Sequence, residues 1–172
     1  STNTTGSNNV AIGPDALYSS TTSSNNTAVG KSALALNTTG ANNTSVGRRA
    51  MEDNTTGASN TALGVNALES NTTAANNVSI GLSSMAANTS GHSNVAVGTF
   101  ALDGNTTASN NTSIGYNSLS ATTTGANNTA LGHKAGQAIT TSSGNTVIGV
   151  NALCTHTQTG YDNTAVGFCA LK

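Results

Sequence analysis

The sequence predicts an all-β fold, a parallel β-solenoid of ten stacked coils. A seventeen-residue unit, approximately Asn-Thr-Ala-Val-Gly-x-x-Ala-Leu-x-x-Asn-Thr-Thr-Gly-x-Asn, recurs along the 172-residue chain. A fixed short period is typical of arrays in which each unit buries its apolar face against its neighbours. The residues before the central glycine alternate as in an extended strand. We therefore expect one domain over residues 1–172, a rod of about 48 Å at ~4.8 Å per coil.

Each coil is numbered here from its central glycine, position 0, so that position −1 precedes the glycine and position +1 follows it. The glycines of coils 1 to 10 are Gly13, Gly30, Gly47, Gly64, Gly81, Gly98, Gly115, Gly132, Gly149 and Gly167. Eight of the nine intervals are 17 residues and the last is 18, with the extra residue expected within 153–157. At position 0 we expect a positive φ or a close backbone approach, which only glycine tolerates easily.

Two aliphatic rows are predicted to line the interior. Position −1 is aliphatic in every coil, and position +4 is Leu or Met in every coil but coil 8. There Gly136 takes position +4, and we expect Ile139 to fill the space. Position −3 is Thr or Val, which favours a strand. Position −2 is uniformly small, and strand alternation turns it away from position −1, so we expect it to be a face against which something packs closely.

Position −4 is asparagine in all ten coils, which predicts a structural ladder. In stacked coils each side-chain amide can donate to the carbonyl oxygen of the next, at a turn where Asn also tolerates left-handed geometry. The ladder residues are Asn9, Asn26, Asn43, Asn60, Asn77, Asn94, Asn111, Asn128, Asn145 and Asn163.

Adjacent threonines occupy positions +8 and +9 of most coils, and in an extended segment only one of each pair points outward. Position +9 gives a candidate surface-binding row: Thr22, Thr39, Thr56, Thr73, Thr107, Thr124 and Thr141. A threonine row suggests an ice-binding solenoid as an alternative function. The pairs are Thr-Thr, however, and not the Thr-x-Thr that would place two outward threonines on one strand.

Asparagine at position +7 begins an Asn-x-Thr or Asn-x-Ser sequon in five coils, which is the acceptor pattern for N-glycosylation. These candidates are Asn37, Asn54, Asn71, Asn88 and Asn105. The pattern is also the natural by-product of a repeat rich in Asn and Thr. If the chain is glycosylated, we expect this row to be the accessible one.

The sparse charge disfavours several classes of function. Five basic and six acidic residues give a net charge of −1, too little to meet a nucleic-acid backbone or an anionic membrane. The local cluster of Lys31, Arg48 and Arg49 with Asp15, Glu52 and Asp53 is interpreted as a solvated mixed-charge patch. No apolar run approaches the ~20 residues that span a bilayer.

No catalytic, cofactor or metal site is predicted. The acidic residues are scattered, and His92, His133 and His156 occupy different repeat positions, which disfavours a metal site. Cys154 and Cys169 are offset by three positions, roughly 10 Å along a strand, which is beyond disulfide reach. We expect free thiols.

The strand motif resembles a known family. Asn8-Asn9-Val10-Ala11-Ile12-Gly13 and 25–30 resemble the Asn-x-x-Ala-Ile-Gly strand of YadA-like trimeric adhesin heads. The longer unit, with 33–34 and 37–40, is similar to repeats of tail-fibre-type proteins that end in an endosialidase-type intramolecular chaperone, as is the variant 132–136. The resemblance implies an extracellular, cell-surface or virion rod, often a homotrimer about one axis. Three rods that meet at an axis would account for the small residues at position −2, but a compact single solenoid could place the same row inside. The period is longer than in the adhesin heads, and no chaperone or anchor is present in these residues.

Three functions follow as hypotheses, none of them catalytic. The first is a structural or adhesive fibre segment whose partners are copies of itself, in a trimer or end to end, and a cell-surface receptor or glycan. The terminal residues occupy matching repeat positions, which suggests an excerpt or mature segment of a longer fibre. The second is the ice-binding solenoid. The third is a carbohydrate-binding surface on the fibre, with Tyr18, Phe100, Tyr116 and Phe168 as the exposed stacking groups, although these do not form one row.

Overall fold

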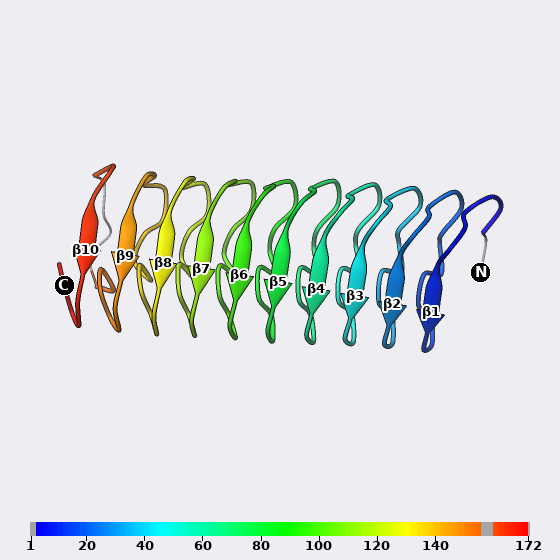
Figure 1. Cartoon of the computed structure of the whole chain (residues 1–172), viewed down its shortest axis with the longest axis horizontal. Helices are drawn as coiled ribbons and strands as arrows, with labels where there is room; N and C mark the ends of the chain where they lie inside the picture. The colour runs from blue at the N-terminus through cyan, green and yellow to red at the C-terminus, as the bar shows by residue number, and fades with distance from the viewer. Residues whose placement is uncertain (1–2, 156–159, 172) are drawn as a thin grey trace.

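The computed structural model describes residues 3–155 and 160–171, and there the chain forms the predicted solenoid (Figure 1). Ten parallel strands of three residues form one sheet in chain order, β1 to β10. The strands are β1 Val10–Ile12, β2 Thr27–Val29, β3 Thr44–Val46, β4 Thr61–Leu63, β5 Val78–Ile80, β6 Val95–Val97, β7 Thr112–Ile114, β8 Thr129–Leu131, β9 Thr146–Ile148 and β10 Thr164–Val166. Figure 1 shows them as a row of nearly parallel arrows along a rod, with β1 and β10 at opposite ends.

The coils stack in repeat register. Each residue of a strand lies opposite the residue at the same repeat position in the next strand, as Ala28 lies opposite Ser45. The pair β9–β10 keeps this register, with Thr164 opposite Thr146, although their glycines are 18 residues apart. The extra residue is therefore accommodated between these strands. The range predicted for it, 153–157, lies partly outside the described residues.

The strand alternation is as predicted, but the assignment of position −1 to the interior was wrong. The small residues at position −2 point into the solenoid, where Ala28, Ala62 and Ala96 are fully buried. The aliphatic residues at position −1 point outward and are exposed or half-exposed in every coil; Leu63 and Leu131 are each 47% exposed. The physical reason is space, because the Leu and Met side chains at position +4 already fill the interior opposite the sheet. Only small side chains fit between them and the strand.

The large apolar core is the row at position +4, as predicted. Leu34, Met51, Leu68, Met85 and Leu102 are fully buried. These residues adopt left-handed backbone geometry, with φ between 48° and 54°. That geometry costs about 1–2 kcal/mol per residue, whereas complete burial of such a side chain contributes about 1.5–3 kcal/mol. Burial therefore offsets the backbone strain of the turn that directs each side chain inward.

Coil 8 achieves the same packing with different residues. Gly136 stands at position +4, and Ile139 is fully buried within the same core cluster. A Cβ added to Gly136 would meet the Ile139 Cδ1 atom at 3.2 Å and the Leu119 Cδ2 atom at 2.8 Å. The prediction that Ile139 fills this space is confirmed.

The predicted asparagine ladder at position −4 is present. The Asn43 backbone N–H donates to the Asn26 Oδ1 atom at 2.9 Å, and the Asn60 backbone N–H donates to Asn43 Oδ1 at 2.9 Å. Side-chain amides of the ladder also donate across the coil to the carbonyl at position +10, as Asn43 Nδ2 does to Gly57 O at 2.8 Å. The ladder thus joins neighbouring coils and closes each coil on itself.

A second asparagine ladder, which the sequence reasoning missed, runs along position +7. Asn54 Nδ2 donates to Asn37 Oδ1 at 2.8 Å, and the contacts continue through Asn71 and Asn88 to Asn105. Each of these side chains also donates to the position +10 carbonyl of its own coil. The two ladders therefore share one row of acceptors inside the rod.

Glycine is required at position 0 for both predicted reasons, a positive φ and a close approach to the backbone of the next coil. Gly81 has a φ of +132°, and a Cβ there would lie 2.6 Å from the Gly98 carbonyl. Any side chain at this corner would force adjacent coils apart.

Candidate functional site

The surface that departs most from a water-soluble exterior is the outer face of the sheet. Positions −3 and −1 of every strand point outward, and together they are called here the outer sheet face. Its position −3 row is Val10, Thr27, Thr44, Thr61, Val78, Val95, Thr112, Thr129, Thr146 and Thr164. Its position −1 row is Ile12, Val29, Val46, Leu63, Ile80, Val97, Ile114, Leu131, Ile148 and Val166. The face carries no charged residue, and its aliphatic row continues over all ten strands.

The candidate threonine row at position +9 lies on a different part of the surface, and all seven of its predicted members are exposed. The partner threonines at position +8 use their hydroxyl groups within the rod. Thr38 Oγ1 donates to Thr55 O at 3.1 Å, and Thr55 Oγ1 donates to Thr72 O at 3.0 Å. The structure thus assigns the outward direction to position +9 and a ladder of hydroxyl-to-carbonyl hydrogen bonds to position +8.

The expectation that the position +7 asparagines are accessible was wrong. Asn37, Asn54, Asn71, Asn88 and Asn105 are all fully buried. Their side-chain amides are donors in the second ladder, and an attached glycan would remove a donor from the interior. In the folded rod this row is structural.

The charged cluster contains one network of ion pairs. Arg49 Nη2 lies 2.7 Å from Glu69 Oε1, and Arg49 Nε donates to Glu52. Glu69 was not part of the predicted cluster, although it stands one coil beyond Glu52 at the same position +5. Lys31 and Arg48 are exposed. Pairs of this kind at a solvated surface contribute little to stability, and the arrangement fits the predicted mixed-charge patch.

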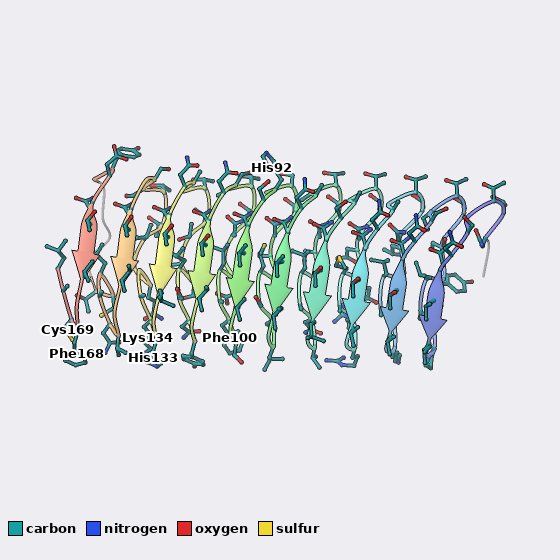
Figure 2. All side chains as sticks on the ribbon, in the orientation of Figure 1. His92, Phe100, His133, Lys134, Phe168 and Cys169 are labelled. Carbon is teal, nitrogen blue, oxygen red and sulfur yellow. The ribbon has the colours of Figure 1, made fainter. Side chains whose placement is uncertain are left out.

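The described histidines and cysteines do not converge. His92 and His133 lie beyond opposite ends of the strands (Figure 2), and His156 is outside the described residues. Over residues 3–155 and 160–171, no group of three metal-ligating side chains forms. Cys154 and Cys169 are free thiols, as expected.

Two of the four candidate aromatic side chains meet, although the four do not form one row. The ring centroids of Phe100 and Tyr116 are 6.3 Å apart, and Tyr116 stacks on His133 at 5.4 Å. Phe100 occupies position +2 of coil 6, and Tyr116 occupies position +1 of coil 7. Their contact therefore joins different repeat positions of neighbouring coils, so it is not evident from residues that share one repeat position. Tyr18 and Phe168 are exposed on other coils.

Comparisons with family models, with curated protein sequences and with solved structures find no significant match to this chain. Within the described ranges, no helix has the length and apolar character needed to cross a membrane.

Proposed function

We propose that the chain is a structural fibre segment that associates side by side with copies of itself through the outer sheet face. The observation that supports this most directly is the aliphatic row at position −1, which runs from one end of the sheet to the other with six members exposed and four partly exposed. Continuous exposed apolar surfaces on soluble proteins usually mark interaction sites. Covering this one would remove Leu63, Ile114 and Leu131, among others, from water.

A second copy of this chain is the partner that fits this face best. Its side chains recur at one spacing for ten coils, and a rod with the same repeat meets that spacing at every level. The face has no charged residue, so like faces meet without repulsion. Three chains around a common axis parallel to the rods would form a closed ring, which is the state implied by the resemblance to trimeric adhesin heads.

Light scattering after size-exclusion chromatography tests this proposal. We expect a mass near three times the 16.8 kDa of one chain. The double variant Leu63→Glu/Leu131→Glu places charges on the outer sheet face of coils 4 and 8, and we expect it to be monomeric. Thr73→Glu/Thr141→Glu is the matched control, because it adds the same charges to the same coils at position +9. A wild-type chain that is monomeric at every concentration would refute the proposal.

Ice binding is a second candidate, since the structure supplies an arrangement that the Thr-Thr pairs lack. On the outer sheet face a threonine at position −3 is followed by an aliphatic residue at position −1, so most strands present Thr-x-Val, Thr-x-Ile or Thr-x-Leu outward. A regular array of hydroxyl and methyl groups on a rigid sheet is suited to ordering water.

This second function needs the outer sheet face to be free, so it opposes self-association. Thermal hysteresis of the wild-type chain, and its loss in Thr112→Lys/Thr129→Lys, would support ice binding. The control Thr107→Lys/Thr124→Lys alters position +9 instead. Wild-type protein without hysteresis at high concentration would eliminate this candidate.

A further inference from the structure

The aromatic contact between coils 6 and 7 borders a groove in a rod that is otherwise nearly uniform. The groove has a volume of about 420 Å³ and is lined by Phe100, Asp103, Tyr116, Asn117, Ser120, Ala121 and Gln137. It lies beyond the glycine corner of the sheet, where Figure 2 places Phe100 and His133, and so outside the outer sheet face. Its volume falls within the range of about 300–1,000 Å³ that is common for ligand sites, but the groove is shallow and largely open to solvent.

The residues of the groove depart from the repeat in a coordinated way. Position +1 is Lys, Arg, Val or Leu in coils 2 to 5 but aromatic in the adjacent coils 7 and 8, as Tyr116 and His133, and again in coil 10, as Phe168. Position +2 is Phe100 in coil 6, where other coils have small, polar or charged residues or cysteine. Packing within the solenoid does not require these aromatic residues, because the side chains of Phe100, Tyr116 and His133 lie outside the core.

The rings form two differently oriented surfaces. Tyr116 stacks on His133 with an interplanar angle of 12°, whereas Phe100 stands at 76° to Tyr116. Phe100 and Tyr116 both line the groove. Aromatic faces of this kind pack against the apolar C–H faces of flat, hydroxylated ring molecules.

The groove is also lined by a row of polar residues at position +5: Asp103, Ser120 and Gln137. The Asp103 Oδ1 atom is buried and has no hydrogen-bond partner in the described part of the chain. Burial raises the pKa of Asp103, while the backbone N–H groups of Asp103 and Gly104 act in the opposite direction. This buried oxygen is out of reach of a ligand, so Asp103 lines the groove through its other atoms.

The geometry points to a binding site for a neutral saccharide in this groove. The Asn117 and Gln137 amides would serve as donors and acceptors to the sugar hydroxyls, and a C–H face of the sugar would rest on Phe100 or Tyr116. The single carboxylate among the lining residues disfavours phosphorylated and acidic ligands, because it would repel them. The inference is independent of self-association, since the groove and the outer sheet face share no residue.

Three substitutions test the site, each of which introduces a residue already used at the same repeat position of another coil. They are Phe100→Asn, as in coil 7, Tyr116→Val, as in coil 4, and Asp103→Ser, as in coil 7. The control is Phe168→Val, which removes an exposed aromatic residue at position +1 of coil 10, far from the groove. Because each change follows the repeat, we expect all four variants to unfold at the wild-type temperature.

Saturation-transfer NMR at millimolar ligand measures binding of maltotriose, cellotriose and chitotriose, with 3′-sialyllactose as the acidic comparison. We expect at least one neutral trisaccharide to bind, and to bind about tenfold more weakly to each groove variant than to the wild type or the control. The inference is overturned if no neutral trisaccharide binds, if the groove variants bind as the wild type does, or if only sialyllactose binds.

Discussion

Coils 2 to 6 and coil 8 fill the same interior in two different ways. In coils 2 to 6 a Leu or Met at position +4 supplies the apolar bulk, and Asn at position +7 supplies the inner ladder. In coil 8 the bulk has moved three residues along the chain, from Gly136 to Ile139, and the asparagine is gone. The comparison shows that stacking conserves apolar volume in each coil, while the second hydrogen-bond ladder can be given up.

Loss of that ladder leaves a mark in the adjacent coil. The ladder asparagines of coils 2 to 5 each accept a hydrogen bond from the asparagine of the next coil, as Asn88 Oδ1 does from Asn105 at 2.7 Å. Coil 7 has Thr122 in place of asparagine, and its hydroxyl donates to Ile139 O at 2.9 Å. The Asn105 Oδ1 atom is therefore buried without a partner. Coils 7 and 8 therefore keep the interior packed, but they leave one buried side-chain oxygen of coil 6 without a hydrogen-bond partner.

The largest expected effect comes from giving coil 8 the residues that coils 2 to 6 have at positions +4 and +7. Ile139→Asn should leave a cavity beside Gly136 and cost about 2–5 kcal/mol of unfolding free energy. Gly136→Leu should overpack against Leu119 and Ile139 and cost about 1–3 kcal/mol. The double variant restores the pattern of coils 2 to 6 and should recover most of both losses. Urea denaturation of the wild type, the two single variants and the double variant measures the coupling free energy between positions 136 and 139. If the two losses simply add in the double variant, the idea that each coil conserves its apolar volume is contradicted.

A smaller effect is expected from shortening the ladder at its middle and at its end. Asn71→Ala removes the donor to Asn54 Oδ1 and the acceptor of Asn88, so it should cost about 1–3 kcal/mol. Asn105→Ala removes only one ladder contact, together with an oxygen that is already unpaired, and should cost about 1 kcal/mol. Both sites are fully buried, which makes them a matched pair in chemical denaturation. Equal losses would show that the ladder contacts are not what distinguishes the two coils.

The smallest effect is expected from Thr122→Asn. The new amide can donate to Asn105 Oδ1, but the hydrogen bond from the Thr122 hydroxyl to Ile139 O is lost, and the new side-chain oxygen would face Ile139, which has no side-chain donor. The unpaired oxygen moves by one coil instead of disappearing, so the free energy of unfolding should stay close to the wild-type value. A clear gain in thermal stability would mean that the introduced amide oxygen finds a donor within the irregular coils.

Much of this architecture could be predicted from the repeat. The period, the in-register strands, the first asparagine ladder and the compensation of Gly136 by Ile139 all follow from residues that recur, or fail to recur, at fixed positions. The groove could not be found in the same way. Phe100 and Tyr116 occupy different repeat positions, and their contact depends on the backbone geometry of the turn that follows the glycine.

The sequence by itself determined that the chain is a stacked β-rod and that positions −1 and −2 point in opposite directions, because a strand alternates its side chains. Only the tertiary structure decided which of the two is inside. That choice depends on the left-handed turns at positions +2 and +4, which bring Leu and Met across the coil and leave room for nothing larger than Ala, Ser or Val opposite them. The aliphatic row is thereby placed on the surface, where it becomes the basis of the proposed self-association.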